Sequence, residues 1–227
     1  MNNKKVVAIV PALNEEANIE RVLKVLTGSE ELDEVILIDD GSTDNTAQIG
    51  ENLGVRTIKL SKAGGSGKGN AILQGIKLTD ADVVVFFDAD LINLTKEHIS
   101  SLIQSVLAGE AVMCVGIRGT PMNMPENFFK LDPLLAISGQ RAVKRELFKN
   151  IPNEHLEGFA IETTLNHYCL ENNLPVCYII LDNLDHITKE KKWGIWTGFG
   201  SRIKMIFEII KMRVKIMFRK KWINLKK

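Results

Sequence analysis

The chain of 227 residues carries a formal net charge of +1, with 45% hydrophobic and 25% charged residues. This length and composition suit one large α/β domain, alone or with an appendage, and they exclude a wholly disordered chain. The three cysteines are too few and too scattered for a disulfide framework or a zinc site, which favours a reducing compartment.

The sequence predicts neither a secretion signal nor a membrane-spanning helix. The first apolar run, residues 6–10, is too short for a signal peptide before Pro11 interrupts it. No run of about 18 apolar residues occurs, so no helix is expected to cross a membrane. We therefore expect a cytoplasmic protein.

Apolar runs and helical patterns alternate through the first 90 residues. Helices are predicted to open at Asn14, where Ile19, Leu23 and Leu26 follow at helical spacing, and after Asp44. A third helix is predicted over 70–78, and strands are predicted over 6–10, 35–38, 55–60, which is short, and 82–87. Strands and helices joined in this order by short links predict a Rossmann-like, mostly parallel sheet with helices on both faces.

Two carboxylates follow the last of these strands. Asp88 and Asp90 leave the sheet at its carboxyl end, where open α/β folds bind their ligands. Two acids this close repel each other unless a positive charge lies between them, and oxygen ligands suit a hard divalent cation. An ordinary acidic turn is the alternative, and it is the better interpretation of an isolated Asp-x-Asp.

A glycine-rich turn, residues 64–69, precedes the third helix. It lacks the Gly-x-x-x-x-Gly-Lys-Ser/Thr pattern of a P-loop, because Gly69 stands where the hydroxyl residue is needed. The first strand–helix junction also lacks a dinucleotide-binding glycine pattern. We interpret the turn as a loop that presents Lys68 to a phosphate, with a solvated surface loop as the alternative.

Four short motifs follow one another along the first 90 residues: Val10-Pro-Ala-Leu-Asn-Glu15, Ile38-Asp-Asp-Gly-Ser-Thr-Asp44, Gly67-Lys-Gly69 and Asp88-Ala-Asp90. In order and spacing they resemble the nucleotide-sugar-binding half of family 2 glycosyltransferases with the GT-A fold. Further along, residues 138–147 resemble the family's Ser-Gly-x-Arg segment, and residues 157–162 resemble its acidic acceptor-side segment. The resemblance covers most of residues 5–190 and implies a GT-A domain over 1–192, with halves 1–95 and 96–192.

The resemblance also implies a set of site residues. Mg²⁺ or Mn²⁺ would be held by Asp88 and Asp90, completed by His186, although a lone histidine is more often structural. The implied catalytic residues are Asp90, Lys68 and Glu162, where Glu162 alternatively only favours a helix dipole. The nucleotide sugar would contact Pro11, Ala12, Leu13, Asn14, Glu15, Asp39, Asp40, Gly41, Lys68, Asp88 and Ala89. The acceptor would contact Arg118, Ser138, Gly139, Arg141 and Glu157.

Within the family the chain resembles polyprenyl-phosphate glycosyltransferases and glucosyl-phosphoglycerate synthases. We therefore expect transfer of a hexose from a UDP- or GDP-linked sugar to a phosphate-bearing acceptor, with a polyprenyl phosphate first and phosphoglycerate as the alternative. Ile92 departs from the glutamine that often stands there in the polyprenyl group. Two other classes stay open, a sugar-phosphate nucleotidyltransferase and an idle binding module at the membrane.

The last part of the chain, residues 193–227, is strongly basic. Residues 202–227 hold ten Lys or Arg and one Glu, so they carry +9 and the preceding 201 residues carry −8. The pattern of residues 202–220 predicts an amphipathic helix flanked by tryptophans, which suits binding to the anionic inner face of a membrane. Packing against the body or a homodimer partner is the alternative, and nucleic acid is disfavoured because the body is acidic.

Overall fold

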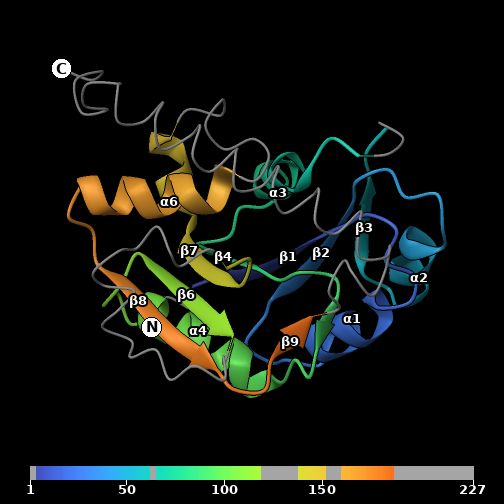
Figure 1. Ribbon diagram of the computed structural model, residues 1–227, viewed down its shortest axis with the longest axis horizontal. Coiled ribbons are helices and arrows are strands. Elements are labelled where there is room, and N and C mark those ends of the chain that lie inside the picture. The colour runs from blue at the N-terminus through green and yellow to red at the C-terminus, as the bar shows by residue number, and fades with distance from the viewer. Residues whose placement is uncertain (1–3, 62–64, 119–137, 152–159, 187–227) are drawn as a thin grey trace, which may run out of the picture. The chain divides into compact units, whose positions relative to one another are not determined.

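The computed structural model describes residues 4–61, 65–118, 138–151 and 160–186 (Figure 1). The chain divides into two compact units, residues 1–187 and 188–227, and every described residue belongs to the first. The predicted basic helix over 202–220, the predicted boundary at residue 192 and Glu157 lie outside the described residues. Within the described part of the chain, no helix combines the length and the apolar character needed to cross a membrane.

A seven-stranded, mostly parallel sheet forms the centre of the first unit, which confirms the predicted fold class. Its strand order is β3-β2-β1-β4-β7-β6-β8, and only β7 runs antiparallel to its neighbours. The strands are β1 Val6–Ala12, β2 Glu34–Asp39, β3 Arg56–Lys59, β4 Val83–Phe86, β6 Met113–Arg118, β7 Arg141–Lys144 and β8 Val176–Leu181. Two short strands, β5 Leu91–Ile92 and β9 Asp185–His186, pair with each other beside it.

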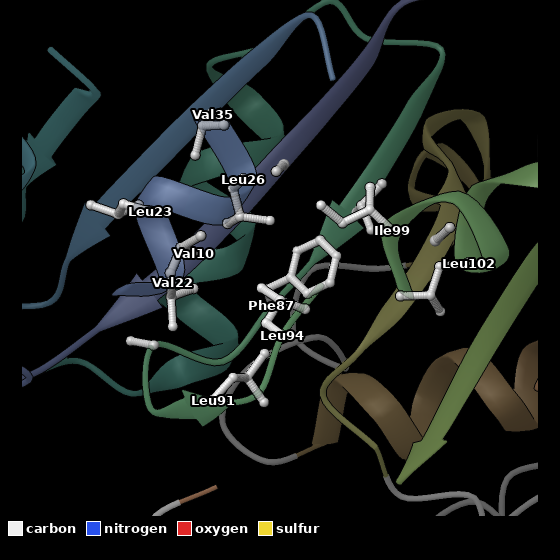
Figure 2. Packing of buried hydrophobic residues seen from close by; sticks show 14 of the residues in the cluster. Val10, Val22, Leu23, Leu26, Val35, Phe87, Leu91, Leu94, Ile99 and Leu102 are labelled. Atoms are coloured by element: carbon white, nitrogen blue, oxygen red, sulfur yellow. The ribbon is translucent and has the colours of Figure 1, made fainter. Parts of the chain in front are cut away.

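Helices cover both faces of this sheet (Figure 1). The α-helices are α1 Ile19–Thr27, α2 Thr46–Asn52, α3 Lys68–Lys77, α4 Lys96–Leu107 and α6 Ala160–Glu171, and a 3₁₀ helix spans Arg145–Asn150. Helices α1 and α4 share one core with the sheet, in which Phe87 lies between α1 and α4 (Figure 2). Phe87 is fully buried, so the chain leaves β4 through the core before it reaches the two aspartates.

One edge of the sheet collects the chain segments that carry polar motifs. The parallel strands β1, β2 and β4 end there, so residues 11–15, 39–44 and 88–90 lie along the same edge. Strand β7 runs the other way, with Arg141 opposite Phe86, so the residues that precede β7 also lie there. The antiparallel strand β7, which the sequence alone does not predict, thus brings residues 138–140 beside residues 88–90.

The first helix starts later than the sequence predicts. Asn14 was expected to open it, but Asn14 has a φ of 54°, and α1 begins at Ile19. The N–H groups of Asn14 and Glu15 donate to side-chain oxygens of Ser42 and Thr46, at 2.9 and 2.7 Å. These bonds tie the segment after β1 to the segment after β2, and they hold residues 14 and 15 outside the helix.

Candidate active site

Three charged side chains from distant parts of the chain meet at the carboxyl edge of the sheet. The ammonium Nζ of Lys68, the first residue of α3, lies 2.7 Å from Asp88 Oδ1 and 3.0 Å from Glu162 Oε1. Glu162 comes from the first turn of α6 and is 6% exposed. The Lys68 side chain therefore joins the acidic motif after β4 to the acidic residue of the acceptor-side segment.

The charge of Lys68 is stabilised by its two partners. Burial alone lowers the pKa of this amine, but the attraction of Asp88 and Glu162 outweighs burial and raises the pKa above its ordinary value. The Lys68 ammonium is therefore charged throughout the physiological pH range. A permanently charged ammonium here can neutralise a phosphate oxygen as readily as a carboxylate.

The second oxygen of Asp88 has a partner that the sequence analysis missed. Gln140 Nε2 donates to Asp88 Oδ2 at 2.7 Å, and Gln140 is 1% exposed. Gly139, which precedes Gln140, lies so close to Lys68 and Asp88 that a Cβ there would be 2.5 Å from Lys68 Nζ and 2.6 Å from both Asp88 oxygens. The only signal for Gln140 in the sequence is its position as the variable residue of the Ser-Gly-x-Arg segment.

Asp40 contacts the glycine-rich turn rather than open solvent. Its Oδ1 accepts from the N–H and the hydroxyl of Ser66, at 2.9 and 2.6 Å, and its Oδ2 accepts from Gly67 N–H at 2.8 Å. Asp40 is 4% exposed, and its own N–H donates to the Ala12 carbonyl. The carboxylate after β2 thus fixes the residues that come directly before Lys68.

The other predicted nucleotide-sugar residues lie on the same edge. Pro11 and Ala12 are the last residues of β1, and Ala12 is the register partner of Asp39. Leu13 is 37% exposed, and Asp39 Oδ1 accepts from Ser42 N–H, while Gly41 takes a φ of 86° in the turn after β2. Their contacts to a nucleotide stay predictions, because the arrangement shows only that they adjoin one another.

The small β5–β9 sheet places His186 beside the residue that follows Asp90. Leu91, which directly follows Asp90, is the register partner of His186. The His186 ring also lies 3.6 Å from the carboxylate of Asp185. Among the described residues, no three His, Cys, Asp or Glu side chains are grouped tightly enough to hold a metal by themselves. The oxygen donors of Asp88 and Asp90 fit Mg²⁺ or Mn²⁺, whereas ligation by His186 stays a prediction.

The predicted acceptor residues are divided between the site and the interior. Arg141 is 1% exposed, and its guanidinium donates to the carbonyl oxygens of Ser138 and Glu162 and to Asn166 Oδ1. These bonds tie β7 to α6, so they position Glu162; acceptor binding by Arg141 stays a prediction. Arg118 ends β6 at the same edge, where its backbone pairs with Leu181.

The family model for "Glycosyl transferase family 2" matches residues 7–168, which is most of the chain. The chain belongs to glycosyl transferase family 2. The chain resembles glucosyl-3-phosphoglycerate synthase of Mycobacterium tuberculosis, with 36% identity over 114 residues, 47% of this chain and 35% of that enzyme. The 4,4'-diaponeurosporenoate glycosyltransferase of Staphylococcus aureus is 34% identical over 113 residues, 48% of this chain and 30% of that enzyme. The match thus spans about a third of these relatives' own length.

A solved structure supports the fold of this family 2 chain beyond the matched segment. Glucosyl-3-phosphoglycerate synthase from M. tuberculosis, in complex with Mn²⁺, UDP-glucose and phosphoglyceric acid, superposes with a TM-score of 0.68 at 27% identity. The superposition covers 81% of this chain and 72% of that one. The predicted GT-A architecture is therefore confirmed.

Proposed function

We propose that this chain transfers a hexose from a UDP-linked sugar to a small phosphate-bearing acceptor, with the help of a divalent cation. The observation that carries the proposal is the meeting of Asp88, Lys68 and Glu162 at the carboxyl edge of a family 2 fold. The relative with this fold binds Mn²⁺, UDP-glucose and phosphoglyceric acid. The alternative acceptor from the sequence analysis, phosphoglycerate, therefore has more support than the polyprenyl phosphate that was expected first.

In this proposal the donor sugar is bound through its diphosphate. Asp88 and Asp90 hold the cation, because Mg²⁺ and Mn²⁺ bind one or two carboxylates together with substrate phosphates. When bound, the cation neutralises the nucleoside diphosphate as it leaves the sugar. The Lys68 ammonium contributes a second positive charge at the same place, since its raised pKa keeps it protonated.

Glu162 is proposed to act on the acceptor. Its carboxylate is 6% exposed and is held by Lys68 on one side, while Arg141 holds its backbone carbonyl on the other. A hydroxyl acceptor must lose a proton as it attacks the sugar, and a positioned carboxylate can accept that proton. When Lys68 turns toward a diphosphate, the Glu162 carboxylate becomes the adjacent hydrogen-bond acceptor for that hydroxyl.

A panel of donors and acceptors tests the proposal directly. UDP-glucose and GDP-mannose are each incubated with Mn²⁺ and with either 3-phosphoglycerate or a polyprenyl phosphate in detergent, and release of UDP or GDP is followed. We expect turnover with UDP-glucose and the small acceptor, and none in excess EDTA. Full activity in EDTA would contradict the metal proposal. Turnover with the polyprenyl phosphate alone would contradict the small acceptor.

The basic tail favours a second candidate, in which the acceptor is lipid-linked. Residues 202–227 carry +9, and each Lys or Arg near an anionic surface contributes about 1 kcal/mol to binding. If the tail binds membrane, the full-length chain associates with vesicles that contain anionic lipid and releases them at high salt, whereas a chain ending at residue 201 does not. Loss of solubility in the shortened chain would instead indicate packing on the body or on a second copy.

Asp40→Ala is expected to weaken UDP binding by about 1–3 kcal/mol, the usual cost when part-buried donors, here those of Ser66 and Gly67, lose their partner. Both Asp40 oxygens bind residues 66 and 67, so the variant acts through the turn that positions Lys68. Because Lys68 is proposed to contact the diphosphate, which uridine lacks, uridine binding should fall less than UDP binding. Calorimetry with UDP and uridine measures both affinities. Asp33→Ala is the matched control, since Asp33 also accepts from a backbone N–H, that of Val6, but at the opposite edge. Equal losses for uridine and UDP would instead indicate a direct contact of Asp40 with base or ribose.

A further inference from the structure

Gln140 is a buried polar side chain at the site to which the proposed function gives no role. It directly precedes β7, is 1% exposed, and donates from Nε2 to Asp88 Oδ2 at 2.7 Å. We propose that Gln140 is a positioning residue, which fixes the Asp88 carboxylate in the orientation that receives the divalent cation. This inference rests on the proposed function, because it concerns the same cation and the same carboxylate.

The orientation of the Gln140 amide follows from its neighbours. An ionised carboxylate only accepts hydrogen bonds, so the NH₂ group must face Asp88. The amide oxygen then faces the hydroxyl of Ser138 at 3.0 Å, and the single hydrogen of that hydroxyl is shared between this oxygen and the Gly116 carbonyl, at 2.5 Å. Ser138 is itself buried. The far end of the amide thus contacts the Ser138 hydroxyl, which itself contacts the backbone of β6, and the amide cannot turn away from Asp88 without losing the Ser138 contact.

Lys68 and Gln140, which both donate to Asp88, differ in a way that matters for a cation. Lys68 carries a full positive charge on a flexible side chain, so it competes with a cation for Asp88 and is drawn toward a bound diphosphate. Gln140 is neutral and anchored, so it holds Oδ2 without cancelling the negative charge of the carboxylate. In this proposal the cation competes with Lys68 for Asp88 Oδ1, because the flexible Lys68 side chain can leave that oxygen.

Gly139 provides independent support for a site built around the Asp88 carboxylate. Both Asp88 oxygens lie 2.6 Å from where a Cβ of residue 139 would be, so the carboxylate lies directly against the backbone there. Ser138, Gly139 and Gln140 thus have complementary effects: the first anchors the amide, the second leaves the space, and the third donates the bond. Partners of a metal-binding carboxylate typically change metal affinity 10–100-fold when they are replaced.

The test is the Gln140→Met variant, which keeps length and burial but removes the amide donor. Mn²⁺ binding in the presence of UDP is followed by electron paramagnetic resonance, and UDP affinity in EDTA and thermal unfolding are measured alongside. We expect Mn²⁺ affinity to fall 10–100-fold while UDP affinity in EDTA stays within about twofold. Gln104→Met, the same change on the exposed face of α4, is the matched control and should bind as the unaltered chain does.

Each other result overturns the inference in a recognisable way. Unchanged Mn²⁺ affinity in folded Gln140→Met, or an equal loss of UDP affinity in EDTA, shows that Gln140 only supports the fold. If Gln140→Met does not fold, Ser138→Ala decides, because it keeps the Gln140 amide and removes the hydroxyl that the amide oxygen and the Gly116 carbonyl contact. It is expected to lower Mn²⁺ affinity in the same direction, and unchanged affinity overturns the inference. An unaltered chain that takes up no Mn²⁺ with UDP overturns the proposed function itself.

Discussion

Asp90→Ala is expected to abolish metal-dependent UDP binding and to lower glycosyl transfer by at least about 10³-fold. The variant removes one of the two carboxylates proposed to hold the cation, whose stabilisation of the leaving diphosphate is worth several kcal/mol. Asp90 lies beyond the end of β4, after the buried Phe87, so its loss opens no cavity in the core. Calorimetry with UDP in Mn²⁺ and in EDTA, together with the transfer assay, measures the effect.

Asp82→Ala is the matched control for this experiment. Asp82 directly precedes the same strand, and its carboxylate accepts from Lys5 N–H at the opposite edge of the sheet. This variant should lose some stability and keep metal-dependent UDP binding. If Asp90→Ala bound UDP and Mn²⁺ as the unaltered chain does, the cation would not depend on Asp90, and its proposed catalytic role would be wrong.

Gly139→Ala is expected to lower transfer about 10²-fold or more with little change in the melting temperature. The added Cβ would lie 2.5 Å from Lys68 Nζ and 2.6 Å from both oxygens of Asp88, so these side chains must move. A displacement of about 1 Å in a catalytic group commonly costs about 10²-fold in rate. The moved atoms belong to side chains rather than to backbone, so the fold should tolerate the change.

Gly109→Ala separates this effect from the general cost of replacing a glycine. Gly109 has a φ of 81°, and no atom lies within 4 Å of the position that a Cβ would take, so alanine there is strained but touches no site residue. It should lower the melting temperature and leave transfer per folded molecule unchanged. A Gly139→Ala enzyme with full activity would show that Asp88 and Lys68 do not need their observed positions.

Local sequence was enough to predict the parallel half of the sheet and its polar edge. Residues 6–10, 35–38 and 83–87 are apolar runs bounded by polar residues, which is the pattern typical of strands covered on both faces. Because parallel strands end at one edge, the order of the motifs already predicts that Asp40 and Asp88 lie near each other. The resemblance to family 2 rests on these same local segments, and the family model confirms it.

Contacts between distant segments could not be predicted in the same way. Gln140 meets Asp88 across 52 residues, and Lys68 meets Glu162 across 94, because β7 runs antiparallel and α6 begins at the same edge. A reversed strand has no local signature here, since residues 141–144 do not form a long apolar run.

The sequence by itself thus determined which residue types stand at the ends of the parallel strands, since strand and turn patterns are local properties of the chain. Only the tertiary structure decided what those side chains bind. It turned Asp40 toward the glycine-rich turn, buried Arg141 behind Glu162, and placed Gln140 and Gly139 against Asp88. The physical reason is that a buried polar group must find its partner in space, and the partner's distance along the chain does not enter that requirement.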